Sequence, residues 1–357
     1  MLPTPSRSHP APMQSGGCYT ANASLQARGA EPALELLALA LERVQVSAHP
    51  LAIVDYGSAQ GGNSLRPMAQ AIRAMRGRVG ADTSLAIIHT DQPENDFSAL
   101  FCLLRDHPDS YLDVDPQVFP FAIGRSFYGQ VMPTAAVTVG WSSFAVHWLS
   151  SAPVRYAGHV WPPMAAPEVR SAFKAHSTED WRAFLTHRAA ELVPGGCLVV
   201  VQPVRQVDGS SSFPVLMAWV QDELEGMAAD GMIEAAEFGG MTIIVYERTP
   251  SAVRAPFADG PFQGLCVRAD VVQDLPDPYW TTYETDGDAT LFAARTIGFF
   301  QAAFLPSLLA ALDRGRDETF RRAFSGRLLA GLRQRLLEAP QPLVCPLATQ
   351  ALLLEKA

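Results

Sequence analysis

Residues 51–65 read LAIVDYGSAQGGNSL, and this stretch decides the fold class. A run of apolar residues ends at Asp55 in a turn that carries Gly57, Gly61 and Gly62, and a helical pattern follows. A short apolar strand that passes through a glycine-rich turn into a helix is typical of the first unit of an open parallel sheet. Ligands of such sheets bind beyond the carboxyl ends of the strands, so this turn is the first candidate binding site.

Helices and strands alternate through the first part of the chain. Helical periodicity is found at residues 31–46, 64–75, 96–105 and 181–192, and short apolar runs typical of strands at 51–55, 84–89, 119–123, 135–139 and 197–202. Strands separated by helices of this length pair in parallel through right-handed crossovers. We therefore expect an α/β fold, with a Rossmann-like core over about residues 31–205 and helices on both faces of its sheet.

The pattern changes in the second half of the chain. Long helices are predicted at 214–229, 290–313 and 318–337, with less regular strands near 242–247, 265–271 and 347–354. We expect late strands from about 241–273 and 342–355 to join the sheet, and a mainly α-helical cap from about 150–180, 206–240 and 274–340. Residues 1–12 are rich in Pro and Ser and are expected to be disordered, which leaves 13–357 as a single unit.

Composition excludes several classes of partner. The chain of 357 residues carries a net charge of −9 and has no basic run, which argues against binding to nucleic acid. Its apolar stretches are shorter than the roughly 18 residues of a membrane span. The five cysteines are scattered without a CxxC pair, which favours a cytoplasmic location. Histidines, cysteines and carboxylates show no metal-ligand spacing, so no metal is expected.

Two classes of cofactor could occupy the glycine turn. A dinucleotide requires GxGxxG, but Ala59 stands where the second glycine should be. The observed pattern, Asp-x-Gly-x-x-x-Gly from Asp55, suits S-adenosylmethionine, which has no pyrophosphate. The next strand ends at Asp91, whose carboxylate can accept both hydroxyls of a ribose. A purely structural turn, and an Asp91 that only caps the next helix, are the alternatives.

Four separated segments carry a family resemblance. They are CYTANASLQ at 18–26, IVDYGSAQGGNSL at 53–65, HTDQPENDFSALF at 89–101 together with GRSFYGQVMP at 124–133, and GWSSFAVHWLSSAP at 140–153. In their order and spacing this chain resembles the SABATH methyltransferases, which methylate carboxylates of small acids such as salicylate, benzoate and jasmonate, and in one branch xanthine nitrogens. Weaker matches continue at 191–201, 245–253 and 295–309, so the resemblance implies a class I methyltransferase sheet over nearly the whole chain.

The resemblance also implies residue roles. It places around S-adenosylmethionine Tyr19, Asp55, Gly57, Asn63, Asp91, Gln92, Ser126 and Phe127. Asp91 would hold the ribose and Phe127 would lie against the adenine. Gln26 and Trp148 would grip the substrate carboxylate, and both are neutral donors that cannot remove a proton. We expect these two residues to be catalytic, because they orient the attacking oxygen.

Some positions depart from the family pattern. Ala23 follows Asn22 where a serine is common, and Phe144 and His147 precede Trp148 where plant members often have Tyr and Met. His147 could be a base, a hydrogen-bond partner of the substrate or a satisfied pocket histidine. Further pocket walls are expected from Phe144, Tyr246 and Phe300.

The sequence therefore predicts a cytoplasmic enzyme that forms the methyl ester of a small, aromatic or apolar carboxylic acid. A homodimer is implied by the resemblance alone. N-methylation of a heterocycle such as a xanthine is the enzymatic alternative, and a non-catalytic cofactor-binding scaffold is the alternative from another class.

Overall fold

The computed structural model describes residues 9–46, 51–113, 115–205, 209–343 and 347–357. Its sheet has the strand order β3-β2-β1-β4-β5-β7-β6. The strands are β1 Leu51–Tyr56, β2 Leu85–Asp91, β3 Val118–Gly124, β4 Val137–Ser143, β5 Leu192–Pro203, β6 Leu265–Leu275 and β7 Leu347–Lys356. Strands β1 to β5 pair in parallel, whereas β7 is antiparallel to both β5 and β6. The predicted parallel core is confirmed.

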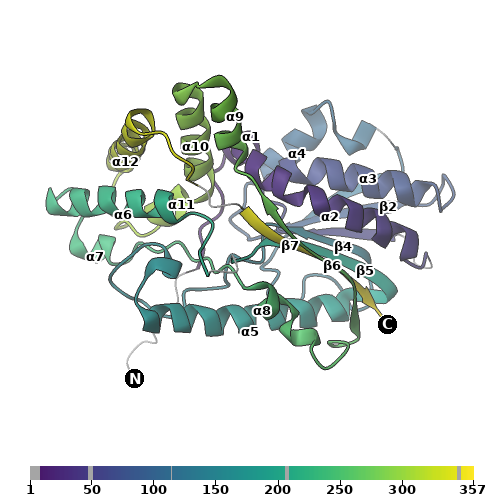
Figure 1. Ribbon diagram of the computed structural model, residues 1–357. Helices are drawn as coiled ribbons and strands as arrows, with labels where there is room; N and C mark the ends of the chain where they lie inside the picture. Colours follow the sequence, from purple (N-terminus) through teal and green to yellow (C-terminus); the bar gives the residue numbers. More distant parts are fainter. Residues whose placement is uncertain (1–8, 47–50, 114, 206–208, 344–346) are drawn as a thin grey trace.

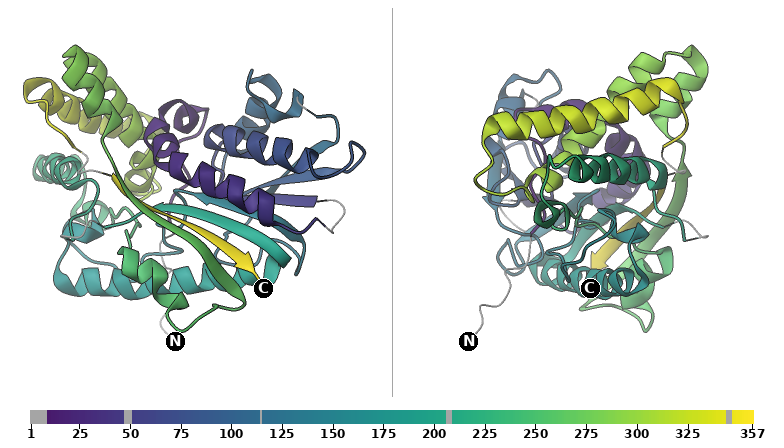
Figure 2. Two further views of the ribbon diagram at one scale, coloured as in Figure 1. Left: turned by 45° about the vertical axis from the view of Figure 1, so that its right-hand side comes forward. Right: turned by 90° about the vertical axis from the view of Figure 1, so that its left-hand side faces the viewer.

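Helices cover both faces of the sheet, as the sequence predicts (Figure 1). The helices are α1 Cys18–Asn22, α2 Ser24–Arg43, α3 Leu65–Arg76, α4 Phe97–Asp106, α5 Pro167–Glu191, α6 Pro214–Ala229, α7 Ala235–Phe238, α8 Pro250–Arg254, α9 Pro278–Asp286, α10 Ala289–Ala303, α11 Leu305–Leu309 and α12 Glu318–Glu338. Helices α2 and α3 lie on one face and α5 on the other, while α6 and α9 to α12 gather beyond one end of the sheet (Figures 1 and 2). This helical group occupies the place expected for the cap.

The N-terminal helix is longer than the sequence indicates. The predicted helix starts at Glu31, but α2 begins seven residues earlier, at Ser24, and Pro32 lies inside it. The extension places Gln26 in the first turn of α2, where its side chain is buried. Most of the segment predicted to be disordered, residues 1–8, lies outside the described residues, whereas residues 9–12 follow a described course without helix or strand.

The strand predicted at 242–247 is absent, and that prediction is wrong. This segment makes single bridges, from Val245 to Trp148 and from Arg248 to Val204, so no continuous ladder forms. It runs instead between the loop after β4 and the end of β5. Arg248, 2% exposed, holds it there by donating to the carbonyls of Val146 at 2.8 Å and Ser177 at 2.8 Å.

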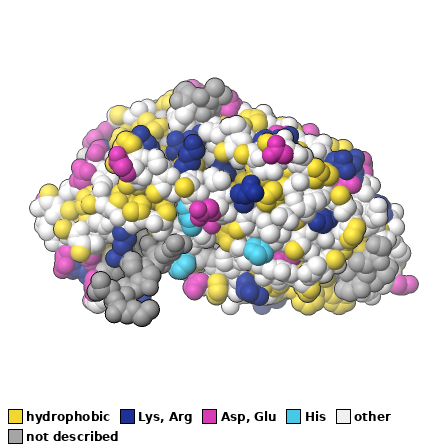
Figure 3. Space-filling view, turned by 90° about the horizontal axis from the view of Figure 1, so that it is seen from below, with side chains coloured by type: hydrophobic (Ala, Val, Ile, Leu, Met, Phe, Trp, Pro, Cys, Tyr) yellow, Lys and Arg dark blue, Asp and Glu magenta, His cyan; other side chains and the backbone are white. Residues whose placement is uncertain are grey.

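Surface features agree with the composition. Within the described part of the chain, no helix is long and apolar enough to cross a membrane. On the face shown in Figure 3, basic side chains stand singly or in small groups among acidic and uncharged ones. This face therefore offers no extended basic surface of the kind that binds a nucleic acid backbone.

The buried position of Arg248 leads to a prediction for stability. Replacement by Met keeps the apolar bulk but leaves buried carbonyl oxygens without donors, so we expect Arg248→Met to lower the free energy of unfolding by about 2–4 kcal/mol. Urea denaturation measures this change. Arg327→Met is the matched control, because Arg327 pairs with Asp230 at the surface, and it should leave the midpoint nearly unchanged. Equal midpoints for both variants would contradict the assigned role of Arg248.

Candidate active site

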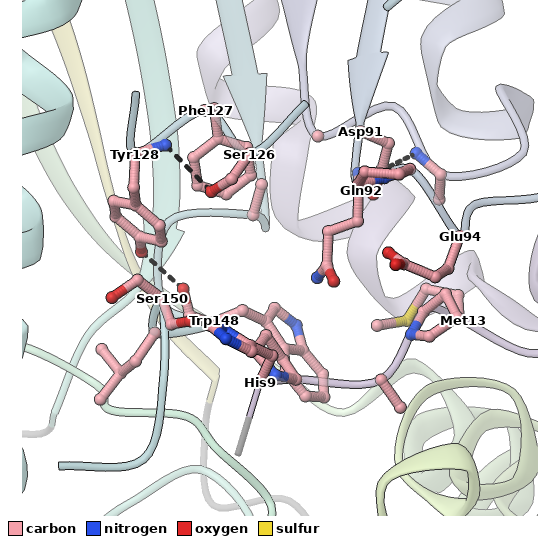
Figure 4. A pocket seen from close by; sticks show the side chains of 18 of the residues that line it. His9, Met13, Asp91, Gln92, Glu94, Ser126, Phe127, Tyr128, Trp148 and Ser150 are labelled. Atoms are coloured by element: carbon pink, nitrogen blue, oxygen red, sulfur yellow. Dashed lines mark hydrogen bonds between the residues drawn. The ribbon is translucent and has the colours of Figure 1, made fainter. Parts of the chain in front are cut away.

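A cavity of about 330 Å³ opens where the strand order reverses, between β1 and β4. Its walls are the segments that follow the carboxyl ends of β1 to β4, together with residues 9–13 of the N-terminal segment. In Figure 4, Asp91 and Gln92 face Ser126 and Phe127 across the space, and Trp148 closes it below. This is the position in which open α/β sheets bind their ligands.

The glycine turn brings the backbone close to this cavity. Gly57 has φ +93°, and a Cβ on it would lie 2.3 Å from the Cβ of Ala145, so a side chain has no room there. Ala59 also has a positive φ, and its carbonyl accepts from Asn95 at 2.7 Å while its N–H donates to Asp91 at 2.7 Å. The turn is thus held open by side chains of the segment that follows β2.

Asp91 is the ionisable group best placed toward a ligand. Its carboxylate accepts backbone N–H groups of Ala59 and Gln92, each at 2.7 Å. Burial raises the pKa of Asp91 to about 6, although these two hydrogen bonds act in the opposite direction. The Gln92 amide beside it points into the cavity (Figure 4). A carboxylate with free lone pairs at this edge can accept hydroxyl groups of a sugar.

Asp55 and Asn63, which were expected around the cofactor, are not among the residues that line either cavity. Asp55 is 2% exposed and lies behind the turn, where it accepts from Ser64 and from His89 at 3.3 Å. Asn63 donates to the carbonyl of Ala23 at 3.3 Å. In the described structure both side chains stabilise the turn from behind.

A buried ion pair holds the opposite wall, the loop of residues 126–132. Arg188 and Glu191 are both 0% exposed and lie 2.7 Å apart at the end of α5. Arg188 donates to the carbonyl of Phe127 at 2.7 Å, and Glu191 accepts the N–H of Val131 at 2.6 Å. Tyr56 of β1 donates to the same carboxylate at 2.7 Å. The pair therefore connects the Phe127 loop to the first strand.

A second, smaller cavity of about 30 Å³ adjoins the first and shares four lining residues with it, namely Met13, Tyr19, Phe144 and Trp148. Its remaining walls are mostly apolar, and they come from Leu25, Trp161, Pro203, Phe213, Phe299, Ala303, Phe304 and Leu347. Leu347 is the first residue of β7. Because β7 runs antiparallel to β5, Leu347 lies at the edge of the sheet where the parallel strands end, and it can line the cavity there. Aromatic walls of this kind suit an aromatic or aliphatic ligand.

Besides Tyr19 and Trp148, the side chains of Gln26, His147 and Glu247 bring polar groups to the smaller cavity. The Gln26 Oε1 and His147 Nδ1 atoms are buried and have no hydrogen-bond partner within the described structure. Burial, with the charge of Arg248, lowers the pKa of His147 to about 3, so this imidazole is neutral at pH 7. Burial raises the pKa of Glu247 to about 7, against hydrogen bonds from Ser212.

The structure brings most of the sequence-predicted site residues together. Tyr19, Gly57, Asp91, Gln92, Ser126, Phe127, Phe144 and Trp148 line the larger cavity, and Gln26, Phe144, His147 and Trp148 line the smaller one.

Tyr246 and Phe300, by contrast, line neither cavity, and their chain neighbours Glu247 and Phe299 do. Tyr246 packs with Leu149 and Phe173 in a separate cluster. Glu247 was not among the predicted site residues, because this segment has no regular periodicity that would fix which side chains face the cavity. The charged pair Glu247 and Arg248, which follows the apolar run 243–246, was the available signal.

No group of three or more His, Cys, Asp and Glu side chains in the described residues is placed to hold a metal ion.

The mixed sheet, the cavity at its switch point and the glycine turn are those of the class I methyltransferase fold. The chain belongs to the SAM dependent carboxyl methyltransferase family, whose model matches residues 10–259. This is the family that the sequence resembles, and the prediction of its class is confirmed.

Several curated proteins are similar over much of the chain. Methyltransferase LUC1 of Fusarium sp is 28% identical over 87% of this chain and 86% of its own length. O-methyltransferase acrG of Aspergillus aculeatus is 30% identical over 73% and 71%. Salicylate carboxymethyltransferase of Clarkia breweri is 30% identical over 67% of each chain.

A solved structure shares the fold. Loganic acid methyltransferase with SAH superposes with a TM-score of 0.75, covering 97% of this chain and 98% of its own, at 18% identity. At this identity the likeness supports the fold, cap included.

The Arg188–Glu191 pair leads to a prediction for cofactor affinity. Arg188→Met leaves Glu191 buried without a counter-ion and releases the Phe127 loop, so we expect a loss of about 3–5 kcal/mol of stability and at least about tenfold weaker binding of S-adenosylhomocysteine. The double variant Arg188→Met/Glu191→Met should recover stability, because no buried charge is left, but it should not recover affinity. Denaturation and calorimetric titration separate the two effects.

The exposed pair Arg105–Asp106, 2.7 Å apart, provides the matched control. Arg105→Met should change neither stability nor affinity appreciably. Full affinity in the double variant would show that the pair does not position the loop.

Proposed function

We propose that this methyltransferase forms the methyl ester of a small aromatic or apolar carboxylic acid. The acid would bind at the smaller cavity, which must widen to receive it, because its present volume of about 30 Å³ holds only about two water molecules. The observation that supports this proposal most strongly is the shared boundary of the two cavities, where Trp148 and Phe144 line both. A cofactor in the larger cavity and an acid in the smaller one would then meet at these residues. The apolar walls favour an acid with an aromatic or aliphatic body.

The residues of the larger cavity fit S-adenosylmethionine. Asp91 would accept the two ribose hydroxyls, and Phe127 would lie against the adenine, with Ser126 beside it. Gly57 lets the backbone approach the ligand, and Gln92 and Tyr19 complete the walls. Asp55 and Asn63 would contribute by holding the turn.

Gln26 and Trp148 would orient the substrate carboxylate. Both side chains line the smaller cavity, and the donors would be the amide Nε2 of Gln26 and the indole N–H of Trp148. Neutral donors suit this task, because a full positive charge would stabilise the carboxylate more strongly than the transition state, in which its charge declines. The two residues would thereby fix the direction of attack.

The bound cofactor supplies an electrophilic methyl group on a sulfonium. No general base is needed, because a carboxylic acid with a pKa of about 4 is already ionised at pH 7. An in-line displacement gives the ester and S-adenosylhomocysteine. The contribution of the chain is to hold the carboxylate at attack distance in a cavity without water, an effect worth about 7–11 kcal/mol in favourable cases.

We also propose that the protein is a cytoplasmic homodimer. The four described cysteines, Cys18, Cys102, Cys197 and Cys266, are free, which suits a reducing compartment. The dimer rests on the family resemblance, and light scattering on the purified protein tests it.

The substrate class is tested by a screen with radiolabelled S-adenosylmethionine. The acids are benzoate, salicylate, anthranilate, indole acetate, cinnamates, jasmonate and farnesoate, with xanthines as the contrasting set, and mass spectrometry identifies the products. We expect a methyl ester from at least one acid. Methylation of a xanthine alone would favour the nitrogen-methylating alternative, and cofactor binding without any product would favour the scaffold.

The variants Gln26→Leu and Trp148→Phe test whether these two residues bind the substrate carboxylate. Each variant loses one donor and keeps most of the apolar bulk, so we expect kcat/KM for the acid to fall about 10- to 1,000-fold. Gln26 does not line the larger cavity, so Gln26→Leu should bind S-adenosylhomocysteine normally. Gln334→Leu, at an exposed position of α12, is the control. Unchanged turnover in both variants would remove these residues from the mechanism.

The raised pKa of Asp91 predicts that cofactor binding depends on pH. The ionised carboxylate accepts the ribose hydroxyls, and its pKa is raised to about 6, so affinity is full above pH 6 and is lost as the pH falls through that value. We expect the Kd of S-adenosylhomocysteine to rise about tenfold per pH unit below this point. Asp91→Asn should bind weakly at every pH.

His9 is another ionisable side chain in the wall of the larger cavity. The variant His9→Gln separates the two groups by calorimetric titration. Retention of the pH profile in His9→Gln supports Asp91, and its loss would assign the effect to His9.

A further inference from the structure

Glu247 is an unexpected residue in a cavity that would receive a carboxylate. It is 1% exposed and lines the smaller cavity among apolar walls. Burying a carboxyl group is costly unless hydrogen bonds compensate it. Ser212 provides compensation, since its backbone N–H lies 3.0 Å from one carboxyl oxygen and 3.2 Å from the other and its side chain also hydrogen-bonds the carboxyl group. The positive charge of Arg205 favours the ionised form as well. A carboxylate offers about four acceptor positions, so capacity remains for a ligand.

His147 lies on the neighbouring segment. Its carbonyl accepts the N–H of Tyr246 at 2.8 Å, which sets the chain before Glu247 alongside the loop after β4. The Nδ1 atom of His147 is buried without a partner in the described structure, and His147 lines the same cavity as Glu247. Glu247 and His147 therefore lie in one mostly apolar cavity, apart from the donors Gln26 and Trp148 that are assigned to the carboxylate.

Glu247 and His147 have no evident part in binding the carboxylate. With a pKa of about 7, Glu247 is ionised in part at neutral pH, and its charge then repels a second carboxylate, so the substrate would turn its own carboxylate toward Gln26 and Trp148. A hydroxyl or amino group on the body of the acid would, in contrast, satisfy the acceptor positions that Ser212 leaves free. The charge distribution thus selects both an orientation and a substituent.

We infer that Glu247 and His147 form a polar subsite that binds a hydrogen-bond donor on the substrate, so that the preferred acids carry a hydroxyl or amino group besides the carboxylate. This inference rests on the proposed function, because it concerns the body of the same acid. Glu247 is then a specificity-determining residue. Gln26 and Trp148 act on the reacting carboxylate, and Glu247 and His147 recognise the rest of the molecule.

The test uses matched acids and purified full-length protein. Hydroxy- and aminobenzoates, and hydroxycinnamates, are compared with the parent acids and with their methoxy derivatives, which lack the donor. We expect kcat/KM of the wild type to favour the best donor-bearing acid about 10- to 100-fold over its parent. Glu247→Leu should remove this preference, and the parent acid should become the better substrate.

Glu247→Gln provides a second variant that preserves size and an acceptor oxygen for Ser212. It should retain part of the preference, because a neutral acceptor binds a donor less strongly than a carboxylate does. Glu284→Gln, an exposed carboxyl on α9, is the matched control and should keep the full preference. S-adenosylhomocysteine affinity and thermal melting confirm that each variant is folded.

The outcomes separate the inference from the proposed function. If wild type, Glu247→Gln and Glu247→Leu all form esters with the same preference for donor-bearing acids, the inference is overturned and the proposed function is not affected. A methyl ether or N-methyl product would also overturn it, because the donor group would then be the nucleophile. No ester from any acid would reject the proposed function, and the inference with it.

Discussion

The buried ion pair between Arg188 and Glu191 is the constraint on which the geometry of the active site depends. The walls of the larger cavity are segments that follow the strands. Such segments are outside the sheet, so no hydrogen bonds between strands fix their positions. The pair ties one of them, the Phe127 loop, to α5 and to Tyr56 of β1. Because the desolvation of two charges offsets most of their attraction, the pair adds little net stability. Its main effect is to fix the position of the Phe127 loop.

The substrate side depends on a second constraint, the early start of α2. This start places Gln26 in the cavity wall and brings Gly29 against Phe144, where a Cβ would lie 2.1 Å from the ring. Phe144 has a φ of +52°, a conformation that few side chains adopt without support. The glycine on α2 thus gives the ring its space, and the ring forms the boundary between the two cavities.

Local chemistry explains how much of this could be predicted from the sequence. The glycine turn and Asp91 were predictable, because positive φ and strand-end carboxylates leave direct signals. The start of α2 was not, since Pro32 normally marks a first turn and only tertiary packing overrides it. The same holds for the segment around Glu247, which is fixed by Arg248 and single bridges rather than by periodicity. A shift of one residue there exchanges Tyr246 for Glu247 in the cavity.

That exchange alters the chemistry assigned to the site. With Tyr246 and Phe300 as walls, the cavity would be almost wholly aromatic, and any flat apolar acid would suit it. With Glu247 and a neutral His147 in the wall, an apolar acid leaves the buried Nδ1 atom of His147 without a partner and gives Glu247 no hydrogen bond beyond those from Ser212, which weakens the complex. An acid with a donor removes the cost. Selectivity between otherwise similar acids can therefore arise from groups that never touch the reacting carboxylate.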